Sequence, residues 1–68
     1  MMRQFVSGEH VRVVNPPEHC LYLDGHTATV VKQINDDRYL LRLDTRQGIP
    51  TGRWQLYYLP PKALAKAN

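Results

Sequence analysis

Apolar and polar residues alternate along several short segments of the chain, a pattern typical of β-strands that bury one face. The first such segment is Val11–Val13, and Asn15–Pro17 ends it because proline supplies no N–H to a strand ladder. Two further strands are predicted at 27–34, where β-branched residues are frequent, and at 38–44. Asn35–Asp37 between them has the side chains of a tight turn, so the pair is predicted to form a β-hairpin.

The C-terminal third predicts one more strand and a short turn. Residues 53–59 alternate again, and Pro60-Pro61 ends the segment. The alternation assigns an inward and an outward face, with Trp54, Leu56 and Tyr58 inward and Arg53, Gln55 and Tyr57 outward. Residues 62–67 have good helix propensity but are too few for an isolated helix. They therefore predict one helical or 3₁₀ turn that leads into a short closing strand.

The number and length of these strands predict the fold class. Four or five short antiparallel strands in 68 residues leave exposed edges, and closure into a small barrel removes them. We therefore predict one all-β domain over residues 1–68, an SH3-like barrel with its core at about 6–66. Eight side chains are expected inside it: Val11, Val13, Ala28, Val30, Leu41, Leu43, Trp54 and Leu56.

Length and composition exclude several classes of protein. A chain of 68 residues has a thin core and little room for a deep substrate cleft. The single cysteine, Cys20, excludes an internal disulfide. The apolar run Leu56–Leu59 is far shorter than the roughly 20 residues of a membrane-spanning helix. We expect a cytoplasmic protein that does not insert into membranes and has no small-molecule substrate.

Charge is distributed unevenly along the chain. Nine Lys and Arg residues stand against six Asp and Glu residues, which gives a net charge of +3. The last acidic residue is Asp44, whereas Arg46, Arg53, Lys62 and Lys66 follow it. A uniformly basic last third favours an anionic partner through long-range attraction. The same charges on a solvated surface would only keep a small protein in solution.

Two stretches resemble the KOW-type motif of small SH3-like barrels. Gly8–Val13 matches a Gly-x-x-Val-x-Val strand, and Leu23–Ile34 contains Gly25 and Val30 at a glycine and a valine position of the family. Ala28 stands where the family usually has a second glycine, and the remaining strands agree in spacing only. The resemblance implies a binding role, since such barrels occur in ribosomal proteins and transcription elongation factors that bind RNA. Similar barrels also dock onto protein as small accessory subunits of photosynthetic complexes.

Residues able to perform catalysis do not form a recognisable set. Cys20 follows His19 directly, and neighbouring residues on an extended chain point away from each other. Asp36 and Asp37 are paired carboxylates, but Asn35 beside them indicates turn chemistry. We expect no enzyme activity and no cofactor.

Five potential metal ligands fall within residues 10–26: His10, His19, Cys20, Asp24 and His26. Their spacing matches no standard zinc site, which usually contains tight ligand pairs. A folded-back loop at 15–26 could still bring three of them together. The prediction is that the chain holds no metal.

The remaining possibility is a binding surface built from cations and aromatic rings, which neutralise phosphates and stack on bases. The candidate residues are Arg12, Tyr22, Arg38, Arg42, Arg46, Arg53, Tyr57 and Lys62. We predict a non-enzymatic accessory factor associated with RNA or DNA. The alternative is an SH3-like accessory subunit or adaptor that docks onto a larger protein complex, with Ile49 as a further apolar contact. If the arginines instead pair with nearby aspartates, the surface has only a structural role.

Overall fold

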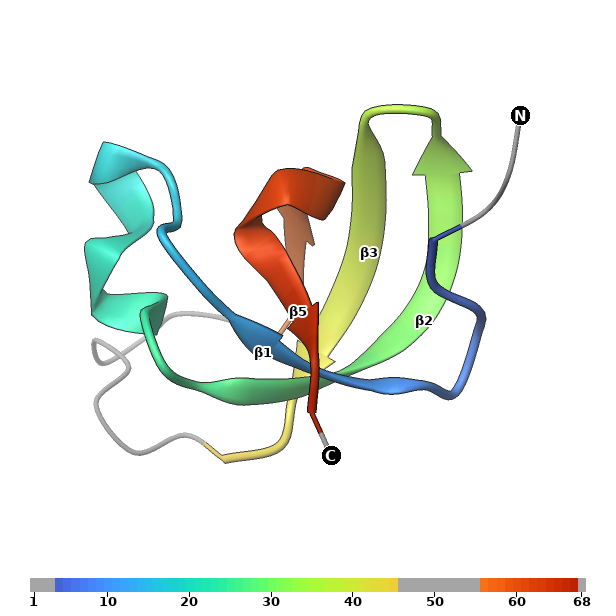
Figure 1. The fold of residues 1–68 in the computed structure, drawn as a ribbon, viewed down its shortest axis with the longest axis horizontal. Coiled ribbons are helices and arrows are strands. Elements are labelled where there is room, and N and C mark those ends of the chain that lie inside the picture. The colour runs from blue at the N-terminus through green and yellow to red at the C-terminus, as the bar shows by residue number, and fades with distance from the viewer. Residues whose placement is uncertain (1–3, 46–55, 68) are drawn as a thin grey trace.

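In a computed structural model of the protein, which describes residues 4–45 and 56–67, five strands and two 3₁₀ segments follow one another (Figure 1). The strands are β1 (His10–Val13), β2 (Thr27–Asn35), β3 (Arg38–Leu43), β4 (Leu56–Leu59) and β5 (Leu64–Lys66). The 3₁₀ segments are η1 (Glu18–Leu23), between β1 and β2, and η2 (Pro61–Ala63), between β4 and β5. The predicted small all-β fold with a 3₁₀ turn near the C-terminus is confirmed. The resemblance to KOW-type barrels stays a prediction.

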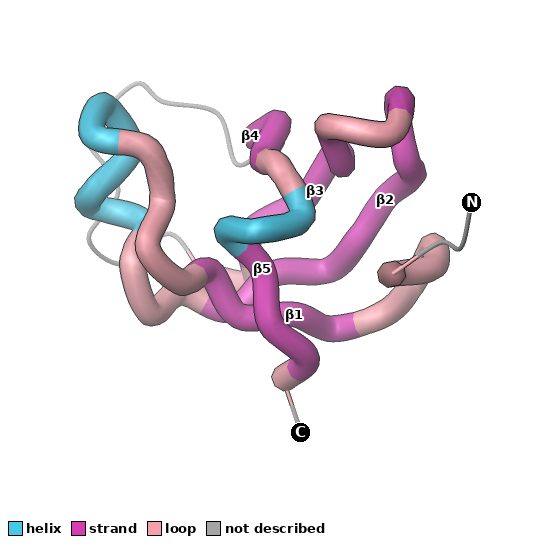
Figure 2. The backbone as a smooth tube through the Cα atoms, turned by 45° about the horizontal axis from the view of Figure 1, so that its top comes forward, coloured by secondary structure: helices cyan, strands magenta, loops and turns pink. Residues whose placement is uncertain are grey.

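The five strands form one antiparallel sheet in the order β4-β3-β2-β1-β5. β4 and β5 are its two edges, yet only residues 60–63 connect them. A 3₁₀ turn rises about 2 Å per residue, whereas the edges of a flat five-stranded sheet lie about 19 Å apart. The sheet therefore curls around an interior, and η2 leads directly from one edge to the other (Figure 2).

β2 and β3 form the predicted hairpin. At its turn the side-chain Oδ1 of Asn35 accepts a hydrogen bond from the backbone N–H of Asp37 at 2.8 Å, which is the turn chemistry expected of asparagine. The pairing register shifts at Val31 and again at Ile34. Such bulges bend a strand and increase its twist, and β2 is visibly curved in Figure 1.

The long connection between β1 and β2 contains η1, where the sequence predicts only a loop. Asn15 (φ 45°) and Gly25 (φ 85°) frame this connection in left-handed conformations that asparagine and glycine adopt most readily. The N–H of Gly25 donates to the carbonyl of Val13 at 2.9 Å, which ties the end of the connection to β1. Cys20 and Leu23 are buried one 3₁₀ turn apart, so η1 covers one end of the interior.

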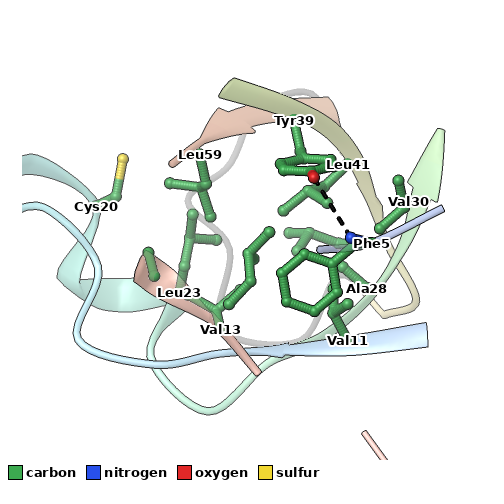
Figure 3. Packing of buried hydrophobic residues seen from close by; sticks show 13 residues of the cluster. Phe5, Val11, Val13, Cys20, Leu23, Ala28, Val30, Tyr39, Leu41 and Leu59 are labelled. Carbon is green, nitrogen blue, oxygen red and sulfur yellow. Dashed lines mark hydrogen bonds between the residues drawn. The ribbon is translucent and has the colours of Figure 1, made fainter. Parts of the chain in front are cut away.

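The core is a cluster of thirteen buried side chains among the described residues (Figure 3). They are Phe5, Val11, Val13, Cys20, Leu23, Ala28, Val30, Tyr39, Leu41, Leu43, Leu59, Ala63 and Leu64. Six of the predicted core residues are therefore confirmed, and Trp54 lies outside the described residues. Phe5 and Tyr39 meet edge to face with ring centroids 5.6 Å apart. The backbone N–H of Phe5 donates to the Tyr39 hydroxyl at 3.3 Å.

The predicted faces of β4 are inverted in the structure. Leu56 and Tyr58 are 47% and 62% exposed, whereas Leu59 is buried and Tyr57 is half-buried. Tyr57 and Leu59 pair with Leu41 and Tyr39, whose side chains point inward, and directly paired residues share a face. All four residues of β4 are apolar, so their polarity does not specify which face is buried, and a shift of one residue exchanges the two faces.

Candidate functional site

The outer face of β3 alternates with its buried face and carries Arg38, Leu40 and Arg42. The register extends this face over the neighbouring strands. Leu40 pairs with Lys32 of β2 on one side and with Tyr58 of β4 on the other. Directly paired side chains in an antiparallel sheet lie about 5 Å apart at Cβ, so Tyr58, Leu40 and Lys32 form a continuous row across three strands.

A second row lies next to the first. Arg42 pairs with Thr29 of β2 and with Leu56 of β4. Arg42 is two residues from Leu40 along β3, so both side chains emerge on the same face. An exposed tyrosine and two leucines are thus interleaved with lysine and arginine on one sheet surface.

An open groove of about 770 Å³ begins at Tyr58, where β4 ends. The β2–β3 turn, the start of η1 and η2 contribute the other sides. The described residues that line it are Pro17, His19, Asn35, Asp37, Arg38, Tyr58, Pro60, Pro61 and Lys62. The volume is within the range of small-ligand sites in proteins. Arg38 and Lys62 line the groove together with the outward-facing Tyr58 of β4.

We name this surface the Tyr58 face after its exposed aromatic residue; its members are Tyr58, Lys32, Arg38, Arg42 and Lys62. The cations on it have no carboxylate partner among the described residues. In this part of the chain Lys66 forms an ion pair with Glu9 at 2.6 Å, and His10 Nδ1 lies 3.8 Å from Asp44 Oδ2. The alternative in which the arginines pair with aspartates therefore does not hold for Arg38 or Arg42. None of these cations forms an ion pair with a described residue, although Asp37 lines the same groove as Arg38 and Lys62.

Three of the predicted binding residues lie on this face, namely Arg38, Arg42 and Lys62, and each is exposed. Arg12 is also exposed, but it lies on β1, where it pairs with Thr27 and Ala65. Arg46, Arg53 and Ile49 fall outside the described residues.

The predicted binding role of Tyr57 is not supported by its position, because its side chain faces inward and packs against the core. The structure brings it together with the other predicted tyrosine. The Tyr22 hydroxyl donates to the Tyr57 hydroxyl at 3.2 Å, and the two rings meet at 68° with centroids 6.2 Å apart. Tyr22 belongs to η1 and is half-buried. This pair connects η1 to β4.

The residues weighed as metal ligands do not converge. Within the described ranges, no group of three or more His, Cys, Asp or Glu side chains could hold a metal ion. Cys20 is buried in the core. His10 lies instead beside Thr29, whose hydroxyl is 3.2 Å from its Nδ1 and donates to Asp44 at 2.9 Å. These contacts link β1, β2 and the residue that follows β3.

Three residues of this surface are not among the predicted binding residues: Tyr58, Leu40 and Lys32. A signal for two of them was present, since Lys32 and Leu40 flank a predicted hairpin turn, but the register that joins them depends on the bulges in β2. Tyr58 was not predicted because the sequence pattern placed it on the inward face of β4, whereas its side chain is exposed.

Within the described part of the chain, no helix has the length and apolar character needed to cross a membrane. Comparison with known proteins gave no significant match to a protein-family profile, to a curated protein or to a solved structure.

Proposed function

We propose that this chain is a non-catalytic module that binds single-stranded nucleic acid through the Tyr58 face. The observation that carries the proposal is that Lys32, Arg38, Arg42 and Lys62 share one surface with an exposed tyrosine. None of these cations forms an ion pair with a described residue. Lysine and arginine neutralise phosphates, and an aromatic ring stacks on a base of any kind. The resemblance to KOW-type barrels, some of which bind RNA, supports the same role.

The exposed ring favours a single strand over a duplex. Tyr58 is 62% exposed and stands on an open sheet surface beside Leu40 and Leu56. Bases inside a duplex are already stacked on both sides, whereas unstacked bases of a single strand are free to lie on a protein ring. The flanking leucines offer apolar contact to the same base or its sugar.

The test is fluorescence anisotropy of labelled single-stranded RNA and DNA of mixed sequence, titrated with the full chain. We expect binding at about 50 mM salt that weakens toward about 200 mM, with a log–log slope of about −0.7 for each phosphate contacted. Arg42→Gln should weaken binding and make the slope shallower. Arg12→Gln removes the same charge from β1, which β2 and β3 separate from β4 in the sheet, and is the matched control. Absence of binding at low salt, or binding that salt does not affect, would show the proposal to be wrong.

A second candidate function is docking onto a larger protein. It is favoured by the adjacent exposure of Leu56 and Tyr58 on β4, which lies at an edge of the sheet. A partner that remains bound to the purified protein after nuclease digestion, and is lost with Leu56→Asp, would support docking. Loss of all bound material on nuclease digestion would argue against it.

A further inference from the structure

One of the described residues that line the groove at Tyr58 is acidic. Asp37 lines it together with Arg38, Lys62 and Tyr58. The carboxylate of Asp37 would repel a phosphate at short range, so a ligand that contacted the groove through phosphates alone would bind less tightly because of it. If the groove binds a ligand, Asp37 favours one that presents hydrogen-bond donors at this position.

The turn itself does not use the carboxylate of Asp37. The hydrogen bonds of the turn involve its backbone: the N–H donates to Asn35 Oδ1 at 2.8 Å, and the carbonyl accepts from Arg38 Nη1 at 3.1 Å. The side-chain oxygens form no ion pair with the described residues. Both oxygens are thus available as acceptors, and an ionised carboxylate accepts two parallel N–H bonds.

This inference rests on the proposed function and names the ligand more closely. In single-stranded nucleic acid the donors are on the base edges. Guanine presents two adjacent donor groups on its Watson–Crick edge, N1–H and the N2 amino group, whereas cytosine and adenine present one amino group and uracil one imino N–H. We infer that the groove binds a guanine base, stacked on Tyr58, with its N1–H and N2–H donors directed to the carboxylate of Asp37 and its neighbouring phosphates at Arg38 and Lys62.

The experiment compares oligouridine strands of equal length that carry one central guanine, cytosine or adenine, or none. Anisotropy is measured with the full chain at one low salt concentration. We expect the guanine strand to bind about 5- to 150-fold more tightly than the all-uridine strand, the range of one good bidentate base contact. Asp37→Asn should abolish this preference and leave binding to the all-uridine strand equal or slightly tighter, because one negative charge is removed.

Asp36→Asn is the matched control, since Asp36 is exposed in the same turn and does not line the groove. It should retain the guanine preference. Equal loss of preference in both variants would attribute the effect to net charge and overturn the inference. Equal affinity of the native chain for all four strands, or tightest binding to cytosine or adenine, would also overturn it while the proposed function stands. Binding to none of the strands would contradict the proposed function itself.

Discussion

The Nζ atom of Lys66 lies 2.6 Å from Oε2 of Glu9, an ion pair that joins β5 to the turn before β1. The other carboxylate oxygen of Glu9 accepts a hydrogen bond from the N–H of Val6 at 3.1 Å. The same Lys66 ammonium lies 5.3 Å from the centroid of the Phe5 ring. The pair thus holds the segment that places Phe5 over the core.

Stability of the fold should depend on pH through Glu9. Its pKa is lowered, first by the hydrogen bond from Lys66 and then by that from the Val6 N–H. A group whose pKa is lower in the folded state stabilises the fold fully above its unfolded pKa, roughly 4.3 for glutamate. That contribution is lost as the pH falls through the folded pKa.

Glu9→Gln should therefore lower the melting temperature near neutral pH and reduce the difference from the native chain as the pH falls from about 6 to about 3. Thermal unfolding followed by circular dichroism at each pH measures this. Glu18→Gln, which removes an exposed carboxylate with no ion pair among the described residues, should follow the native curve. A constant difference between Glu9→Gln and the native chain at every pH would contradict the assignment.

The register of β4 predicts opposite results for its two leucines. Leu59 is 1% exposed and Leu56 is 47% exposed. Leu59→Ala should lower the free energy of unfolding by about 2–5 kcal/mol, because it removes buried methyl groups and leaves a cavity. Leu56→Ala should change it by less than about 0.5 kcal/mol. Urea denaturation measures both values, and the reverse order would restore the inward placement of Leu56.

The contrast between β3 and β4 shows how far the sequence specifies the fold. In β3 the charged Arg38 and Arg42 alternate with apolar residues, so the pattern identifies the buried face directly. In β4 all four residues are apolar, and only pairing with β3 selects Tyr57 and Leu59 for the interior. η1 was missed for a related reason. Its one sequence signal is the three-residue spacing of Cys20 and Leu23, and a segment this short depends on tertiary contacts.

The candidate site was predicted in part for the same physical reasons. Arg38, Arg42 and Lys62 were found because charged residues on a small barrel remain outside. The exposed ring of this surface, Tyr58, was not predicted, since its exposure follows from the register of β4. The groove joins the β2–β3 turn to η2, and only the curl of the sheet brings these segments together.

The contact between Tyr22 and Tyr57 should couple η1 to β4 energetically. Tyr22→Phe removes the donor of the 3.2 Å hydroxyl contact and should destabilise the fold by about 0.5–1.5 kcal/mol. A double-mutant cycle with Tyr57→Phe isolates the pair, because contacts that Tyr57 makes elsewhere cancel in it. We expect the double variant to be less destabilised than the sum of the single variants. Additive effects would show that the two hydroxyl groups do not interact.

Tyr58 distinguishes stacking from charge attraction on the proposed interface. Tyr58→Ala should weaken binding to a single strand by about 5- to 150-fold, the loss of roughly 1–3 kcal/mol for one stacked base. The salt slope should stay the same because no phosphate contact is removed, whereas Arg42→Gln makes it shallower by about 0.7. Tyr58→Phe keeps the ring and should bind almost as the native chain does. Because Tyr58 is exposed, unfolding in urea should be nearly unchanged in both variants. If Tyr58→Ala bound nucleic acid with unchanged affinity, the interface would consist of the cations alone. The expected preference for single-stranded over duplex nucleic acid would then lose its basis.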